Sequence, residues 1–299
     1  MGRLHQFVFL AGLLCASSVR AQLYDYRVES GTRLAASGDE VPYDLFIPVP
    51  PADAVVRPAP AVILTHGFGS NKFFHRNQAI YMVRRGMIVM TPNLVRLFTG
   101  ESQLRNIDNT VGHLEWLAQR TATPGDELFS RLDPARLGLA GHSAGGAVSF
   151  EAAAGAQERG LGLVSLVLLD AVPWPRTVQH AGQLAPLWLS SLRGEPHPCN
   201  AGGNILTLLP NLTFPTVDTR IIGGSHCDPL NPGIAVCNIL CGDSPPGTDT
   251  IFARLMYLFF RDTFGLPELG GDPLSYAQAL ALYELTGKAR SVAVTPVSP

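Results

Sequence analysis

Four short apolar runs, separated by stretches of helical character, constrain this chain more than any other feature. The runs are AVIL, MIVM, LGLA and LVSLVLL, at residues 61–64, 87–90, 137–140 and 163–169. A run that is apolar on both faces is typical of a buried parallel strand, because helices cover both sides of such a sheet. Helices are predicted between the runs, at 74–85, 107–119 and 144–156. This order predicts an α/β fold, with a mostly parallel central sheet and helices on both faces.

Length and composition agree with one such domain. The chain has 299 residues, of which 46% are hydrophobic and 15% charged, and this low charge argues against disorder. We expect a single domain over 22–299, with a core at about 43–264 and a C-terminal tail at 266–299. Weaker patterns predict an edge strand at 43–48, two more strands at 186–190 and 219–222, and an apolar helix at 250–264.

Charge and hydropathy exclude two kinds of partner. The formal net charge is −2, and the chain has no clustered basic surface of the kind that nucleic-acid binding requires. No later stretch reaches the roughly 18 uninterrupted apolar residues that a membrane span needs. We therefore expect neither a nucleic-acid partner nor stable membrane insertion, and the sequence does not indicate an oligomeric state.

The first 21 residues have the pattern of a secretory signal peptide. Arg3 precedes a short apolar run at 7–19, and Val19 and Ala21 are the small residues before a cleavage site. A buried N-terminal helix is the alternative interpretation. The full signal pattern favours a secreted or periplasmic protein.

Four cysteines remain after such a cleavage, and all lie in the last third of the chain. They are Cys199, Cys227, Cys237 and Cys241. An even number in an exported protein favours two disulfides, and three pairings are open. A zinc site is the weaker alternative, because paired C-x₂-C spacings are lacking. We expect no metal and no cofactor.

The sequence Gly141-His142-Ser143-Ala144-Gly145 lies between a predicted strand and a predicted helix. A G-x-S-x-G pattern in this context is typical of a sharp turn that lifts a nucleophilic serine clear of the sheet. The turn also places the serine at a helix N-terminus, where partial positive charge favours a developing oxyanion. We therefore predict that Ser143 is a nucleophile rather than part of a Gly-rich connection.

A second loop, His66-Gly67-Phe68-Gly69, follows the first apolar strand. An oxyanion hole in this arrangement takes one backbone N–H from the residue after the nucleophile and one from such a loop. The candidates are therefore the amides of Ala144 and Phe68. The same glycines would also suit a tight turn.

His226 is the predicted general base, because it directly follows the last predicted strand. Asp170, at the end of the strand after the nucleophile helix, is the favoured acid, since a carboxylate buried there needs a hydrogen-bonding partner. Glu195, after the following strand, is the alternative acid. His142 flanks the nucleophile and is a candidate substrate contact.

The motifs HGFG, GHSAGG and GGSH, in this order, resemble those of secreted α/β-hydrolases related to bacterial cutinases, polyester hydrolases and plant chlorophyllases. The resemblance spans roughly residues 43–264. It implies that Phe68 and Trp174, of the Pro173-Trp174 pair, line an ester cleft. An acid at Asp170 is closer to the chlorophyllase pattern than to the cutinase pattern. The resemblance also implies disulfides that join Cys199 to Cys227 and Cys237 to Cys241.

Together these features predict a serine carboxylic-ester hydrolase that acts on hydrophobic esters through an acyl-enzyme. A chlorophyllase-like esterase, a polyester hydrolase and a lipase are alternatives within this class. A non-catalytic binding module on the same scaffold is the alternative from another class.

Overall fold

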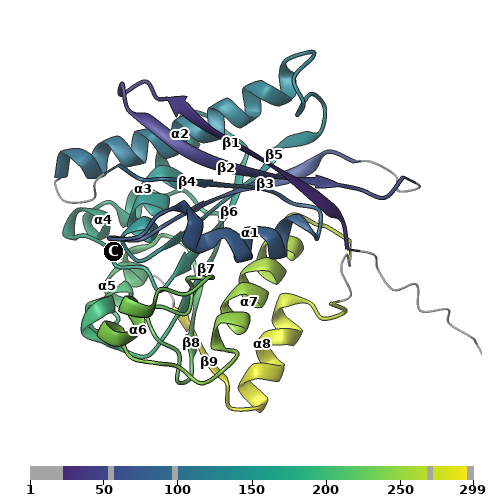
Figure 1. Ribbon diagram of the computed structural model, residues 1–299. Coiled ribbons are helices and arrows are strands. Elements are labelled where there is room, and N and C mark those ends of the chain that lie inside the picture. The colour runs from purple at the N-terminus through teal and green to yellow at the C-terminus, as the bar shows by residue number, and fades with distance from the viewer. Residues whose placement is uncertain (1–22, 53–56, 96–99, 268–271, 295–299) are drawn as a thin grey trace, which may run out of the picture.

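The computed structural model describes residues 23–52, 57–95, 100–267 and 272–294, so the expected signal peptide at 1–21 lies outside the described residues. The described strands form one nine-stranded sheet in the order β1-β2-β4-β3-β5-β6-β7-β8-β9 (Figure 1). Their bounds are Asp25–Leu34, Glu40–Val49, Ala59–Thr65, Ile88–Pro92, Leu132–His142, Leu163–Leu169, Trp188–Arg193, Thr216–Ile221 and Ala289–Val294 for β1 to β9.

The six inner strands from β4 to β8 run parallel, as the sequence predicts. Strand β3 pairs with β4 on one side and with β5 on the other. The chain therefore leaves β3 in one direction and returns on the other side. In parallel sheets, ligand sites form at such a switch, beyond the carboxyl ends of the strands. The loops that follow β3 and β5 both begin at this edge of the sheet.

Helices cover both faces of the sheet. One face carries α2 (Gly100–Ala122), α3 (Ala144–Glu158), α4 (Pro175–Gln179) and α5 (Ile205–Leu208). The other face carries α1 (Arg76–Val83), α7 (Thr248–Thr263) and α8 (Tyr276–Leu285) (Figure 1). Each face has its own cluster of buried apolar side chains, and the continuous apolar strands contribute to both clusters. Burial of the strands on both sides is what excludes water from the sheet.

The remaining described helices are short and lie in connections. They are α6 (Ala235–Cys241) and the 3₁₀ turns η1 (Lys72–His75), η2 (Ala181–Gln183), η3 (Pro198–Asn200) and η4 (Leu209–Asn211). No helix among the described residues is long and apolar enough to cross a membrane.

The two edges of the sheet correct the expected extent of the core. Strand β2 is not an edge strand, because β1 pairs with it antiparallel from Asp25 to Leu34. At the other edge, β9 pairs antiparallel with β8, so the expected C-terminal tail contributes α8 and a strand. Both outer strands carry charged residues such as Arg27 and Arg290, since an edge strand is only partly buried. Their sequences therefore lack the apolar runs that identified the inner strands.

Candidate active site

Ser143 occupies a strained turn between β5 and α3. Its backbone has φ 55° and ψ −125°, in a region that non-glycine residues rarely adopt. The glycines around it permit close backbone approach. A Cβ atom on Gly145 would lie 2.3 Å from the carbonyl oxygen of His66, and one on Gly146 would lie 2.3 Å from the Cβ of Ala171. The local sequence thus forms this turn only with glycine at both positions.

The loop after β3 lies directly against Ser143. A Cβ atom on Gly67 would lie 2.8 Å from the Cβ of Ser143, so the backbone of the loop contacts the serine side chain. The next residue, Phe68, is 57% exposed. Ala144 is the first residue of α3, where backbone amides lack intrahelical acceptors. The two residues predicted to form an oxyanion hole therefore flank the serine on two sides.

His226 joins the predicted nucleophile to the predicted acid. Its Nε2 lies 3.0 Å from Ser143 Oγ, and its Nδ1 lies 2.5 Å from Asp170 Oδ2. All three residues are at least 92% buried, with exposed fractions of 8% for Ser143, 7% for His226 and 1% for Asp170. Residues from three distant segments thus form one hydrogen-bonded chain at the carboxyl edge of the sheet.

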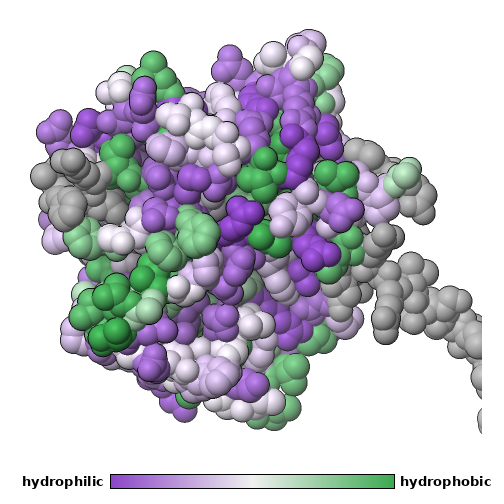
Figure 2. Space-filling model, in the orientation of Figure 1, coloured by the Kyte–Doolittle hydropathy of each residue, from purple (hydrophilic) through white to green (hydrophobic). Residues whose placement is uncertain are grey.

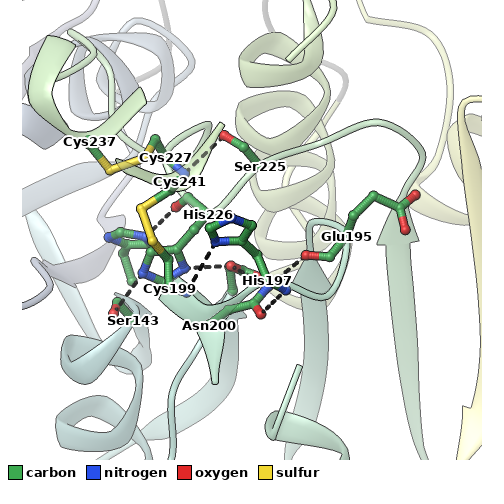
Figure 3. Close-up of a disulfide and its surroundings, with 12 residues drawn as sticks. Ser143, Glu195, His197, Cys199, Asn200, Ser225, His226, Cys227, Cys237 and Cys241 are labelled. Carbon is green, nitrogen blue, oxygen red and sulfur yellow. Dashed lines mark hydrogen bonds and ion pairs between the residues drawn. A yellow bond between two sulfur atoms is a disulfide. The ribbon is translucent and has the colours of Figure 1, made fainter. Parts of the chain in front are cut away.

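The alternative acid, Glu195, points away from this chain (Figure 3). Its carboxylate accepts a hydrogen bond from the Gly223 amide at 3.2 Å and forms an ion pair with Arg220 at 3.4 Å. The strand ends therefore place Asp170, and not Glu195, beside the His226 ring.

Three donors surround the Asp170 carboxylate. Besides His226, the Gly194 amide donates to Oδ1 at 2.9 Å, and the Asn200 side-chain amide lies 3.2 Å from Oδ1 and 3.1 Å from Oδ2. Asp170 also has a positive φ of 44°, so its backbone is strained like that of Ser143. The sequence reasoning missed Asn200. It sits in a loop without periodicity, and the neighbouring Cys199 was the only signal that pointed there.

His142 has a different position from the one expected. It is 3% exposed, and its Nε2 donates to the backbone carbonyl of His226 at 2.7 Å. It therefore supports the loop of His226 from behind and does not line the surface as a substrate contact. The neighbouring strand end is too crowded for its ring to reach solvent, because Gly67 packs against it.

Three buried histidines lie on the Ser143 side of the site. Burial lowers the pKa of His66 and of His75 to about 4, and it lowers the pKa of His142 well below its ordinary value, with further repulsion from His226 and His75. His66 Nδ1 contacts the Gly67 carbonyl and its Nε2 accepts from the Leu94 amide. These rings are therefore neutral at pH 7, and they shape the site without adding positive charge.

The disulfide pairing differs from the one that the resemblance implied. Cys199 is bonded to Cys241, and Cys227 is bonded to Cys237 (Figure 3). Cys237 and Cys241 are one turn apart on α6, so their side chains share one face of the helix. Each therefore reaches a different loop. The sulfurs of Cys227, Cys237 and Cys241 lie within 4.8 Å of one another, but disulfide bonds occupy them in this structure.

The second predicted aromatic contact, Trp174, lies in the segment after β6. It is partly buried, and two residues earlier the Val172 amide donates to the Ser143 carbonyl at 3.0 Å. Phe68 and Trp174 thus lie in two segments, after β3 and after β6, that each contact Ser143 through a neighbouring residue.

Comparison with known proteins identifies a matching family and solved structures of similar fold. The chlorophyllase family profile matches residues 16–192, which is more than half of the chain and includes Ser143 and Asp170 but ends before His226. Curated protein sequences gave no match. Among solved structures, dienelactone hydrolase from Anabaena variabilis has a similar fold, with 19% sequence identity and a TM-score of 0.55 over 80% of this chain and 98% of that one. The α/β-hydrolase fold predicted from the sequence is therefore confirmed.

Proposed function

The chain belongs to the chlorophyllase family of carboxylic ester hydrolases, and from this premise we propose that it is a secreted serine esterase acting on hydrophobic esters. In this proposal Ser143 is the nucleophile, His226 the general base and Asp170 the acid. The observation that supports it most strongly is the continuous contact from Ser143 Oγ through the His226 ring to Asp170.

The proposed reaction proceeds in two steps. Ser143 attacks the ester carbonyl while His226 Nε2 accepts its proton, and the backbone amides of Phe68 and Ala144 stabilise the oxyanion. His226 then donates the proton to the leaving alcohol. In the second step a water molecule, deprotonated by His226, hydrolyses the acyl-enzyme and regenerates Ser143. Asp170 keeps the Nδ1–H tautomer of His226 in place throughout.

The preference for hydrophobic esters is supported by the side chains around the site. Phe68 is exposed beside Ser143, and helix α6 presents Val236, Ile239 and Leu240 to solvent, with exposed fractions of 60%, 81% and 68%. Figure 2 shows hydrophobic side chains gathered over α6 and its surroundings. Because Cys237 of this helix is bonded to Cys227, which follows His226, the apolar surface is covalently joined to the base loop. A hydrophobic ester could therefore contact Phe68 beside Ser143 and the apolar side chains of the helix bonded to the base loop.

Within the ester hydrolases, the family match favours a chlorophyllase-like esterase over a polyester hydrolase or a lipase. Export is also part of the proposal. It is supported by the signal pattern and by two disulfides, which persist in oxidising compartments.

The decisive experiment combines labelling with turnover. The wild-type protein should react with a fluorophosphonate probe and hydrolyse nitrophenyl esters, with kcat/KM rising as the acyl chain lengthens. Ser143→Ala should lose the label and at least about 10³-fold in kcat, as nucleophile removal does in other serine hydrolases. Ser37→Ala, a change at an exposed serine away from the site, should behave as wild type. Hydrolysis undiminished in Ser143→Ala would reject the mechanism, and no turnover in the wild type would favour a binding module.

A further inference from the structure

Asn200 is buried beside the proposed acid and uses the two ends of its side-chain amide differently. Its exposed fraction is 1%. The nitrogen donates toward both Asp170 oxygens, at 3.2 and 3.1 Å, and to the Glu195 carbonyl at 2.9 Å. The oxygen accepts from the amides of His197 and Gly203, at 2.8 and 2.9 Å. One end of the side chain therefore serves the carboxylate, and the other holds its own loop.

The Asp170 carboxylate needs such a donor. It is 1% exposed, so solvent does not balance its charge, and a buried carboxylate is costly unless hydrogen bonds satisfy it. The Gly194 amide binds only Oδ1, whereas Asn200 spans both oxygens. Rotation of the carboxylate away from His226 would break the contacts with Asn200. The geometry thus ties the orientation of Asp170 to this amide.

A covalent bond holds the loop that carries Asn200. The preceding residue, Cys199, is bonded to Cys241 on α6, and the same helix is bonded through Cys237 to Cys227, which follows His226 (Figure 3). Helix α6 therefore braces the loop that supports the acid and the loop that carries the base. The loop that carries His226 has no regular secondary structure, and the loop that carries Asn200 has only the short 3₁₀ turn η3.

We propose that Asn200 is a positioning residue, whose amide N–H group holds the Asp170 carboxylate in the orientation that His226 requires. This inference rests on the proposed function of the same site. The competing explanation is that Asn200 only closes its loop through the oxygen contacts with His197 and Gly203.

The substitution Asn200→Asp separates these explanations. Aspartate is nearly isosteric and keeps an oxygen for the His197 and Gly203 amides, but it replaces the donor that faces Asp170 with a second acceptor. Two carboxylates so close together do not both ionise freely. We expect kcat to fall about 100-fold with KM changed less than about twofold, and the pH profile of kcat to change shape. Asn200→Ala should lose about 10-fold. Asn211→Ala, an exposed asparagine in the same segment, is the matched control.

A second readout does not depend on activity. The His226 Nδ1 proton, in a 2.5 Å contact with Asp170, should give a far-downfield proton NMR signal that moves or broadens in Asn200→Asp and stays in Asn211→Ala. An unchanged signal together with wild-type kcat in Asn200→Asp would overturn the inference. The wild type could also lack turnover that depends on Ser143, while the signal still changes in Asn200→Asp. This result would reject the proposed function but would support the positioning of Asp170 by Asn200.

Discussion

The two halves of the candidate site are held together by different means. The serine half consists of Ser143, the loop at 66–69 and the elbow at 141–146. It is held by backbone atoms in close contact, and four of its glycines, at 67, 141, 145 and 146, would clash with neighbours if they carried a Cβ. The histidine half consists of Asp170, the loop at 194–203 and the segment at 223–241. It is held by side-chain hydrogen bonds and two disulfides.

The difference follows from what surrounds each half. The serine half lies where β3, β5 and α3 meet, and these regular elements fix the course of its backbone. The histidine half is built mainly from loops, with only η3 and α6 as regular elements, and the conformational entropy of loops opposes a fixed geometry. Crosslinks lower that cost by restricting the unfolded chain. Where regular elements fix the backbone, small residues that allow close packing are therefore sufficient. Where loops form the site, hydrogen bonds and disulfides must hold the geometry.

The largest effect should come from a single methyl group in the serine half. Gly145→Ala places a Cβ 2.3 Å from the His66 carbonyl oxygen, a backbone atom that has no room to move. We expect a loss of more than about 10³-fold in kcat/KM, because both the elbow and the oxyanion loop must shift. Esterase kinetics and fluorophosphonate labelling would measure it. Gly100→Ala, where a Cβ meets no atom within 4 Å, is the control. An active Gly145→Ala enzyme would show that close packing does not maintain this half.

Removal of the disulfides should weaken the histidine half by an intermediate amount. The Cys199–Cys241 bond spans 42 residues and the Cys227–Cys237 bond spans 10. On the chain-entropy account, replacing both cysteines of a pair by serine lowers the free energy of unfolding by about 4 kcal/mol for the longer loop and about 3 kcal/mol for the shorter. Urea unfolding measures both.

Activity extends this comparison of the disulfides. Loss of either bond should also lower kcat, because the loops that support Asp170 and His226 are freed. In the enzyme that remains folded, kcat should fall more than the fraction of protein that the fluorophosphonate probe labels. Equal stability in both double variants, with unchanged kcat, would contradict the role given to helix α6.

Acid should act on the two halves in opposite directions. The folded-state pKa of His66 and His75 is about 4, below the ordinary value of 6.5, so the folded state binds fewer protons than the unfolded state in this window. Stability is therefore lost as pH falls from 6.5 to 4, by up to about 3 kcal/mol for each histidine. In the histidine half, burial raises the pKa of Asp228, so its contribution favours folding as pH falls.

The measurement is Tm between pH 8 and pH 4. His75→Gln should make the decline in Tm shallower, because one neutral buried histidine no longer opposes acidification. His180→Gln, at a partly exposed histidine, should leave the slope as it is. An identical slope in all three proteins would show that the buried rings do not set the acid sensitivity of the fold.

Much of the serine half could be predicted from the sequence because its signals are local. The apolar run that ends at Leu64, the glycines at 141, 145 and 146, and the small-residue helix after them each impose a backbone shape on a few neighbouring residues. Parallel order then brings their ends together at one edge of the sheet. Asp170 could be predicted in the same way, because it directly follows an apolar strand.

The rest depended on contacts between distant segments. Asn200 has no pattern around it, and its contact with Asp170 spans 30 residues of chain. The pairing of the cysteines required helix α6, whose one face directs Cys237 and Cys241 to two loops, and a resemblance without that helix implied the wrong bonds. The outer strands β1 and β9 escaped detection because partly exposed strands do not need continuous apolar runs.

The amino-acid sequence by itself determined the inner strands of the sheet, the turn at Ser143 and the order of these elements, because periodicity and glycine placement act over a few residues. Only the tertiary structure decided which carboxylate faces His226, which amide holds that carboxylate and which sulfurs join. Those choices depend on which loops from separate strands lie close together, and a pattern in a few neighbouring residues does not encode the distance between such loops.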